Sequence, residues 1–266
     1  MDKEKKLRLI IKKTGGLVIA FSGGVDSTFL SKVAFDELGG RAVAVTATSP
    51  TYPMRELREA EQLAKLIGIR HIVVDSNELK IPGFSANPAN RCYFCKKELF
   101  QKIKKIAKKL GIKYVADGSN VDDDADYRPG RKAVKELGVL SPIKQAGLGK
   151  AEIRVISKKL GLPTADKQSY ACLASRFPYG TTITAGNLNK IDQLEELLMR
   201  HGLSQLRVRY HDNLVRLEVM PKDLKKLAGT ALADKVVHAA KKLGFKYVAL
   251  DMQGYRTGSM NEVLRK

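Results

Sequence analysis

Apolar and polar positions along the chain follow one pattern up to about residue 180 and another beyond it. In the first part, short apolar runs without alternation predict buried strands of a parallel sheet. Between these runs, apolar side chains recur at helical spacing, and strands that alternate with helices indicate right-handed crossovers. The expected strands are 17–21, 41–49, 71–75 and 114–118, and the expected helices are 25–38, 54–69, 97–110, one ending near 138, and 150–160. We therefore predict an α/β fold with a doubly wound parallel sheet.

The periodicity is lost between Lys167 and Thr181, which predicts a structured functional loop at the edge of a domain. After this segment the pattern changes to helices at 183–200 and 231–243 and strands at 206–210, 215–219 and 247–251. Alternation within these strands indicates a sheet that is covered on one face. We expect two domains, residues 1–180 with the parallel sheet and residues 181–266 as a small α+β domain.

The turn after the first expected strand reads Ser22-Gly23-Gly24-Val25-Asp26-Ser27 and opens a helix. The glycines permit close approach of the backbone to a ligand, and the unpaired N–H groups of a helix start attract anions. The spacing matches neither Walker A nor the dinucleotide fingerprint. It resembles the pyrophosphate loop (PP-loop) of ATP pyrophosphatases, which cleave ATP to AMP and pyrophosphate, although an ordinary strand–helix turn is the alternative. Asp117 and Gly118 follow the fourth strand and are expected at the same, ligand-binding edge.

The net charge of the chain indicates which classes of partner it attracts. The chain has 48 Lys and Arg against 28 Asp and Glu, a formal net charge of +20, which attracts nucleotides, phosphorylated small molecules or RNA. Much of this charge lies in lysine-rich helices whose ordinary role is a solvated face. No run of 18 apolar residues is present, so we expect no membrane contact. The first residues do not resemble a signal peptide, and we expect a cytoplasmic location.

Three cysteines are candidates for chemistry: Cys92, Cys95 and Cys172. The pair Cys92-x-x-Cys95 is expected just before a helix, where helix N–H groups stabilise thiolates. Three interpretations remain open for this pattern: a redox pair, a zinc site, or an iron–sulfur cluster held by all three thiolates with one iron open. A purely structural role is a further alternative for Cys172. A zinc site lacks a fourth ligand, because the four histidines show no ligand spacing.

Taken together, these segments resemble the LarE family, ATP-dependent sulfur transferases of nickel-pincer nucleotide cofactor biosynthesis. The Cys172 segment is the family-specific part, whereas the Ser22–Ser27 loop is shared by the PP-loop superfamily. The matching stretches are 22–27, 91–96, 117–120, Asp126-Tyr127-Arg128-Pro129-Gly130 with Ser141-Pro142, 171–176, 207–209 and 216–218.

The resemblance implies an enzyme that adenylates the two carboxylates of a pyridinium mononucleotide, releases pyrophosphate and forms thiocarboxylates. Ser22, Gly23, Gly24, Asp26 and Ser27 would bind ATP, together with Asp117 and Gly118, and Asp26 would hold Mg²⁺. Arg176, Arg207 and Arg209 are candidates for the phosphate and carboxylates of the substrate, because a guanidinium binds either with two parallel bonds. A surface charge or a contact to a partner subunit is the alternative for each arginine.

The family has two versions of sulfur donation. In one, a single cysteine at the Cys172 position surrenders its own sulfur and becomes dehydroalanine. In the other, three cysteines hold a [4Fe–4S] cluster whose open iron carries a replaceable sulfide. The presence of Cys92 and Cys95 favours the cluster, with sulfide or a sulfur-donor protein as the source.

Two rival functions remain. Relatives with the same loop and three cysteines thiolate tRNA, and a net charge of +20 suits RNA, yet no zinc ribbon or RNA-recognition signature is present, so a nucleic-acid partner is not expected. A non-catalytic ATP sensor or sulfur carrier is the third possibility. We expect a homo-oligomer.

Overall fold

The structure is a computed structural model that describes residues 2–125, 129–168 and 170–264. The chain forms two compact units. The N-terminal unit comprises Met1–Ile81 and Asn90–Tyr170, and the C-terminal unit comprises Pro82–Ala89 and Ala171–Lys266. The domain boundary expected between residues 180 and 181 stays a prediction.

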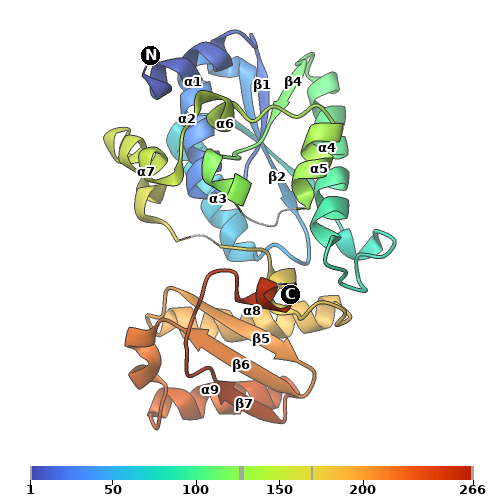
Figure 1. Cartoon of the computed structure of the whole chain (residues 1–266), viewed down its shortest axis with the longest axis vertical. Helices are drawn as coiled ribbons and strands as arrows, with labels where there is room; N and C mark the ends of the chain where they lie inside the picture. The colour runs from blue at the N-terminus through green and yellow to red at the C-terminus, as the bar shows by residue number, and fades with distance from the viewer. Residues whose placement is uncertain (1, 126–128, 169, 265–266) are drawn as a thin grey trace. The chain divides into compact units, whose positions relative to one another are not determined.

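The N-terminal unit contains a four-stranded parallel sheet, which confirms the predicted α/β class (Figure 1). Its strands are β1 (Leu17–Ala20), β2 (Ala42–Thr48), β3 (Arg70–Asp75) and β4 (Tyr114–Ala116), in the order β3-β2-β1-β4. Val18 of β1 is in register with Val43 on one side and Val115 on the other. The strand order therefore reverses at β1, and open α/β sheets bind ligands beyond the carboxyl ends of the strands at such a point.

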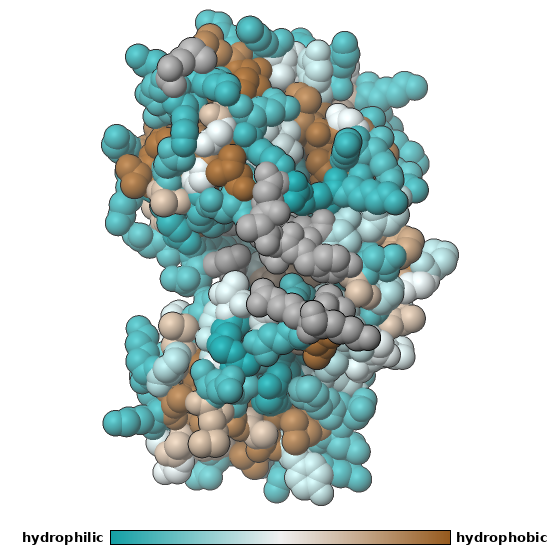
Figure 2. Space-filling model, in the orientation of Figure 1, coloured by the Kyte–Doolittle hydropathy of each residue, from teal (hydrophilic) through white to brown (hydrophobic). Residues whose placement is uncertain are grey.

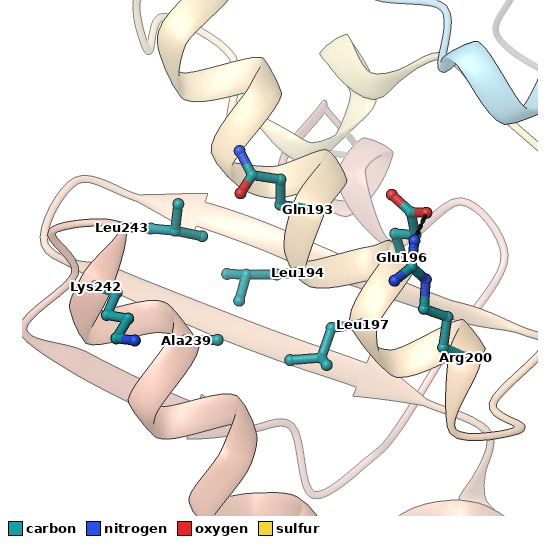
Figure 3. A pocket seen from close by; sticks show the side chains of 8 residues that line it. All are labelled: Gln193, Leu194, Glu196, Leu197, Arg200, Ala239, Lys242 and Leu243. Carbon is teal, nitrogen blue, oxygen red and sulfur yellow. Dashed lines mark hydrogen bonds and ion pairs between the residues drawn. The ribbon is translucent and has the colours of Figure 1, made fainter.

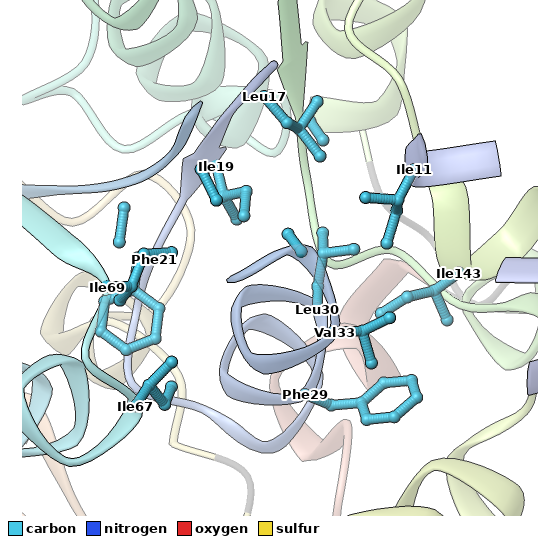
Figure 4. Packing of buried hydrophobic residues seen from close by; sticks show 14 of the residues in the cluster. Ile11, Leu17, Ile19, Phe21, Phe29, Leu30, Val33, Ile67, Ile69 and Ile143 are labelled. Atoms are coloured by element: carbon cyan, nitrogen blue, oxygen red, sulfur yellow. The ribbon is translucent and has the colours of Figure 1, made fainter. Parts of the chain in front are cut away.

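Helices cover both faces of this sheet. They are α1 (Lys3–Lys12), α2 (Val25–Leu38), α3 (Met54–Ile67), α4 (Arg91–Lys109), α5 (Gly130–Glu136), α6 (Pro142–Ala146) and α7 (Lys150–Lys159). Alternate residues of β1 serve different cores, as the period of a strand requires. Leu17 and Ile19 pack with Leu30 and Val33 of α2 (Figure 4), whereas Val18 belongs to the core that α4 and α5 cover.

Helix α4 begins at Arg91, six residues before the helix start expected from the sequence. Cys92 and Cys95 therefore lie within its first turns and not ahead of it. The expected start at Lys97 was wrong because the apolar stripe of the helix, Phe100, Ile103 and Ala107, is confined to its later turns. In the first turn it is the side chain of Arg91 that is buried.

The C-terminal unit is a small α+β assembly. Its elements are α8 (Ala185–Arg200), β5 (Leu206–His211), β6 (Leu214–Val219), α9 (Ala231–Lys242) and β7 (Tyr247–Leu250). The sheet order is β5-β6-β7, with an antiparallel β5/β6 hairpin and a parallel β6/β7 pair. Apolar residues of β5 and β6, such as Val208 and Leu217, are buried on one face of the sheet. Arg207, Arg209 and Glu218 on the other face are buried as well, so the expectation that only one face is covered was wrong.

Two further points complete the fold. Within the described ranges 2–125, 129–168 and 170–264, no helix is both long and apolar enough to cross a membrane. Asp126, Tyr127 and Arg128, which carry part of the motif before Gly130, lie outside the described residues.

Candidate functional site

The loop between β1 and α2 has the form of an anion-binding cradle, at the switch point of the sheet. Gly24 is the N-cap of α2 in extended conformation and makes no side-chain cap, so the N–H groups of the first turn stay available to a ligand. Gly23 has a φ of 67°, in the left-handed region that glycine adopts without strain. The backbone here has the form that the sequence predicts for a phosphate site.

Close packing fixes the two ends of this cradle. A Cβ added to Gly23 would lie 3.3 Å from the Cα and Cβ of Ala60 in α3. A Cβ added to Gly118 would lie 3.0 Å from the amide nitrogen of Ser27. Glycine at 118 thus lets the loop after β4 touch the start of α2, which brings the two predicted nucleotide segments together.

The loop hydroxyls are part of the cradle. The Oγ atoms of Ser22 and Ser27 lie 3.1 Å apart. Ser27 Oγ donates to the carbonyl of Gly24 at 3.2 Å and accepts from the Ser22 amide at 3.3 Å. These bonds close the turn and hold both hydroxyls at the helix start.

Asp26 has the geometry of a ligand for a cation. Its Oδ2 accepts from Lys150 Nζ at 2.5 Å, whereas its Oδ1 is shielded from solvent and has no hydrogen-bond partner among the described residues. An orphaned carboxylate oxygen beside an anion cradle fits Mg²⁺, which is bound through one or two carboxylates together with phosphate oxygens.

Lys150 was missed by the sequence reasoning. It is the first residue of α7, where the helix dipole disfavours a cation. A lysine in this unfavourable position, directly after a glycine N-cap, is the signal that could have identified it. Its ion pair with Asp26 places a positive charge at the cradle.

Asp117 organises its own loop. Its Oδ1 accepts from the Ser141 hydroxyl at 2.7 Å and from the Ser119 amide at 3.2 Å, and its Oδ2 accepts from the Ser119 hydroxyl at 2.6 Å. The carboxylate is buried and fully engaged. Its predicted contact to the nucleotide stays a prediction, and the role that the structure gives it is to shape the segment that contains Gly118.

Two side chains hold the carbonyl oxygens of the cradle. Tyr52 donates its hydroxyl to the carbonyl of Ser22 at 3.0 Å, and Lys167 Nζ donates to the carbonyl of Gly23 at 3.2 Å. Lys167 also pairs with Glu56 at 3.0 Å and Glu59 at 2.8 Å. Burial, and then the charges of Glu56 and Glu59, raise the pKa of Tyr52, so this hydroxyl remains a donor at neutral pH. Neither residue was predicted.

The cysteines are divided between the two units. Cys92 and Cys95, three residues apart in α4, share one face of the helix. Cys95 Sγ donates to Glu78 Oε1 at 3.7 Å. Cys172, exposed, is the N-cap of a short 3₁₀ turn (Leu173–Arg176) in the C-terminal unit. No disulfide joins any of the three, all of which the structure describes.

Thiolates are the ligands that an iron–sulfur cluster requires, and Cys92 and Cys95 lie where one cluster could take both. No assembled metal site is present, however: among residues 2–125, 129–168 and 170–264, no group of three His, Cys, Asp or Glu side chains is placed to hold a metal ion. The convergence of all three thiols stays a prediction.

Arg176 has a structural role that the sequence did not indicate. Its side chain is wholly buried and forms a bidentate pair with Glu195 of α8, with both N···O distances 2.8 Å. Its Nη1 donates to the carbonyls of Ala171 at 2.6 Å and Cys172 at 3.1 Å. The guanidinium therefore positions the backbone of Cys172, and its predicted contact to substrate stays a prediction.

Arg207 and Arg209 lie two residues apart on β5 and so share the face of the sheet opposite to the apolar core. Arg209 donates to Glu218 at 2.7 Å, to the carbonyl of Ser175 at 2.8 Å and to Ser259 at 2.9 Å. Its buried Nε has no partner among the described residues. The guanidinium of Arg207 lies 5.1 Å from the ring centre of Tyr255.

This face of the sheet carries further charge. Arg216 of β6 is directly opposite Arg209 and pairs with Asp251 at 2.8 Å. Burial, followed by the charges of Arg216 and Arg209, lowers the pKa of His211, and the charges of Asp212 and Glu218 oppose this shift. An anionic ligand is the chemistry that such a face suits.

A groove between α8 and α9 lacks the cluster of arginines that marks this face of the sheet. Figure 3 shows Leu194 and Leu197 of α8 facing Ala239 and Leu243. The groove that they line has a volume of about 390 Å³. The polar rim includes an ion pair between Arg200 and Glu196 at 2.6 Å. Among the described residues, no Ser, Thr or Cys side chain lines this groove, and its one carboxylate, that of Glu196, is paired.

Comparison with known proteins identifies relatives over the full length of the chain. It is 45% identical over 265 residues to an uncharacterised protein of Synechocystis, covering 100% of this chain and 99% of the relative. It is 34% identical over 265 residues to pyridinium-3,5-bisthiocarboxylic acid mononucleotide synthase of Lactiplantibacillus plantarum, covering 99% and 95% of the two chains. An uncharacterised protein of Methanocaldococcus jannaschii is 31% identical over 245 residues, 92% of each chain.

More distant relatives match only part of the chain and include argininosuccinate synthase of Methanocaldococcus jannaschii, 28% identical over 160 residues, 55% of this chain and 40% of that protein. No protein-family model matches the chain. Three observations indicate the same family: the full-length similarity, the anion cradle after β1 and the three cysteines. The chain belongs to the LarE family, that of the pyridinium-3,5-bisthiocarboxylic acid mononucleotide synthase, within the PP-loop ATP pyrophosphatase superfamily.

Proposed function

We propose that this protein is an ATP-dependent sulfur transferase that converts the carboxylates of a pyridinium dicarboxylate mononucleotide into thiocarboxylates. The proposal is supported by the relative of Lactiplantibacillus plantarum, whose name is that of a bisthiocarboxylic acid mononucleotide synthase. The observation that carries the use of ATP is the cradle at the start of α2, with its uncapped N–H groups and the orphaned Oδ1 of Asp26.

The chemistry explains why ATP is needed. A carboxylate is a poor electrophile because it would have to expel oxide, and adenylation makes AMP the leaving group while pyrophosphate is released. The N–H groups of the cradle and Lys150 would bind the developing charge on the pyrophosphate. Mg²⁺, held by Asp26, would offset the charge of the phosphate oxygens.

The second half of the reaction needs a sulfur nucleophile that displaces AMP from the acyl-adenylate. We propose that Cys92, Cys95 and Cys172 together hold a [4Fe–4S] cluster, which would supply a replaceable sulfide when bound. The shared helix face of Cys92 and Cys95 supports this version. Arg176 would hold the backbone of Cys172 in position through its bonds to the carbonyls of Ala171 and Cys172.

Arg207 and Arg209 are the proposed contacts for the anionic groups of the substrate. The unpartnered Nε of Arg209 supports this role. Arg176 fits it less well, because its donors are already engaged by Glu195 and by backbone carbonyls.

Release of pyrophosphate from ATP in the presence of the pyridinium dicarboxylate mononucleotide tests the proposal. Asp26→Asn is expected to abolish the release, because the substituted amide no longer provides an anionic ligand beside the cradle. Asp36→Asn, which alters an exposed ion pair with Lys32 in the same helix, is the matched control and should retain it. A wild-type protein that releases no pyrophosphate with this substrate would exclude the proposed function.

One observation favours a second candidate. A tRNA-specific 2-thiouridylase of Thermoanaerobacter is 27% identical over 191 residues, 57% of this chain and 52% of that protein. A tRNA substrate would be bound with steep salt dependence, whereas a mononucleotide would not. Measurement of tRNA affinity at two salt concentrations separates the two functions.

A further inference from the structure

Two grooves on the N-terminal unit are lined by lysines and carry no chemistry in the proposed reaction. The first, between α4 and β4, has a volume of 650 Å³, and the second, along α5, one of 750 Å³. We call them together the basic grooves. Their cationic lining residues are Lys104, Lys105, Lys108 and Lys113 in the first and Arg131, Lys132, Lys135 and Lys144 in the second.

The charged side chains that line the basic grooves are cationic. Among the described residues, neither groove is lined by an Asp or Glu side chain. Two lysines elsewhere on this unit have carboxylate partners: Lys3 pairs with Glu152 at 2.7 Å and Lys32 with Asp36 at 2.5 Å. In the basic grooves, Lys104 donates to the carbonyl of Leu137 at 2.9 Å, and Lys132 forms an exposed pair with Glu136 at 3.9 Å. Such a surface attracts an anionic partner.

The grooves adjoin and have an apolar floor. Ile112 and Val115 line the first and Val134 and Val139 the second, and all four belong to one buried cluster. The amide of Leu140 donates to the carbonyl of Val115 at 2.8 Å, which joins the two grooves along the outer edge of β4. Outside this floor, the surface along α4 and α5 is predominantly hydrophilic (Figure 2).

We propose that the basic grooves dock an acidic segment of a partner protein, in which apolar side chains are interspersed among carboxylates. The carboxylates would pair with the lysine rim while the apolar side chains cover the valine and isoleucine floor. RNA fits less well, since no aromatic side chain lines either groove to stack on a base and only one of the eight cations is an arginine. The extent of the two grooves suits a polypeptide segment better than a single small anion.

The position on α4 connects this surface with the cysteines. Cys95 and Lys104 are nine residues apart in one helix, which corresponds to about 13 Å along its axis. A protein docked at the basic grooves is thereby held on the helix that carries Cys92 and Cys95. The docking itself does not depend on the proposed sulfur chemistry.

The test uses two labelled 16-residue peptides of equal charge, one alternating Glu with Leu and one alternating Glu with Ser, and a 16-nucleotide RNA. Affinity is measured by fluorescence anisotropy at 150 mM salt with the full chain. We expect the Glu/Leu peptide to bind at least tenfold more tightly than the Glu/Ser peptide. The variant K105E/K108E/K113E should bind the Glu/Leu peptide at least tenfold more weakly than the wild type.

The matched control is K5E/K6E/K12E, which reverses three exposed lysines of α1 and should change the affinity less than twofold. Circular dichroism and thermal unfolding check the fold of both variants, and K105Q/K108Q/K113Q replaces the first if it unfolds. The proposal is overturned if both reversals weaken binding equally, if neither peptide binds, or if RNA binds more tightly and depends on the groove lysines.

Discussion

Buried charges in the C-terminal unit fix the backbone near Cys172. Glu195 Oε1 accepts from both Arg176 Nε at 2.8 Å and the amide of Val208 at 3.0 Å. Arg176 in turn binds the carbonyls of Ala171 and Cys172. One buried ion pair therefore joins α8, β5 and the turn that begins at Cys172. Desolvation makes such a pair costly to break, because the remaining charge is left without compensation.

Arg176→Ala is expected to lower the free energy of unfolding by about 3–5 kcal/mol, since it leaves the carboxylate of Glu195 buried without a cation. Urea denaturation measures the loss. Arg200→Ala, which breaks the exposed pair with Glu196 on the same helix, should cost no more than about 1 kcal/mol. A folded Arg176→Ala protein with unchanged stability and lost affinity for substrate would instead assign Arg176 to the ligand.

His71 links protonation to stability in the N-terminal unit. Thr46 Oγ1 donates its single hydrogen to the carbonyl of Phe21 at 2.8 Å, so it accepts from His71 Nε2 at 2.7 Å, which favours the neutral Nε2–H tautomer. Burial lowers the pKa of His71 below its ordinary value of 6.5, and the charge of Glu61 offsets this in part. The unfolded chain therefore binds the proton more tightly than the folded one.

It follows that the His71 contribution to stability is fully present above about pH 6.5 and is lost as the pH falls through the lower pKa of the folded state. His71→Gln should flatten the decline in the free energy of unfolding between pH 7.5 and 5, measured by urea denaturation. Titration of the His71 ring by NMR gives the pKa directly. A folded-state pKa above 6.5 would contradict the argument.

At the scale of single elements, the two glycines of the loop after β1 serve different purposes. The fold requires glycine at position 23, whereas it does not require glycine at position 24. Gly23 requires glycine for folding, given its φ of 67° and the 3.3 Å approach of an added Cβ to Ala60. Gly24 does not, because its backbone is extended and an added Cβ would meet only Ser22 Oγ at 3.4 Å. Glycine at position 24 is what we expect where a ligand approaches the backbone.

Gly24→Ala is expected to keep the stability of the wild type within about 1 kcal/mol while it weakens ATP binding, because the methyl group obstructs the phosphate. Gly23→Ala should destabilise the fold by about 1–3 kcal/mol through strain in the left-handed region. Thermal unfolding and equilibrium binding of ATP, measured on both variants, separate the two effects. Unchanged ATP affinity in Gly24→Ala would remove the cradle from the proposed site.

The elements that could be predicted are those with a strong local pattern. The apolar runs of β1 and β2 identify buried strands, and the Ser/Gly turn before Val25 identifies the cradle. The start of α4 could not be predicted, because the buried apolar residues of this helix lie only in its later turns, whereas the residue buried in its first turn is Arg91. The roles of Lys150, Lys167 and Arg176 depend on residues more than 15 positions away, and no local pattern records such pairs.

At the scale of the whole molecule, the cluster proposal draws on both compact units, with Cys92 and Cys95 from one and Cys172 from the other. We expect the anaerobically reconstituted protein to contain iron and sulfide near the ratio of one cluster. Cys92→Ala, Cys95→Ala and Cys172→Ala should each lose the cluster and the activity, because each removes one of three thiolate ligands. Tyr93→Phe, between the two α4 cysteines, should retain both; it removes only the hydroxyl bound to Glu136.

The other version of sulfur donation, in which Cys172 surrenders its own sulfur, predicts different results in the same experiments. Only Cys172 would then matter, each chain would act once, and the spent protein would lose the mass of hydrogen sulfide as Cys172 becomes dehydroalanine. A cluster supplied with sulfide should yield more than one product per chain and leave Cys172 intact, since the sulfur transferred is replaced from solution and not taken from the side chain. Mass spectrometry of the protein after turnover distinguishes the two, and dehydroalanine at position 172 would exclude the cluster as the source of sulfur.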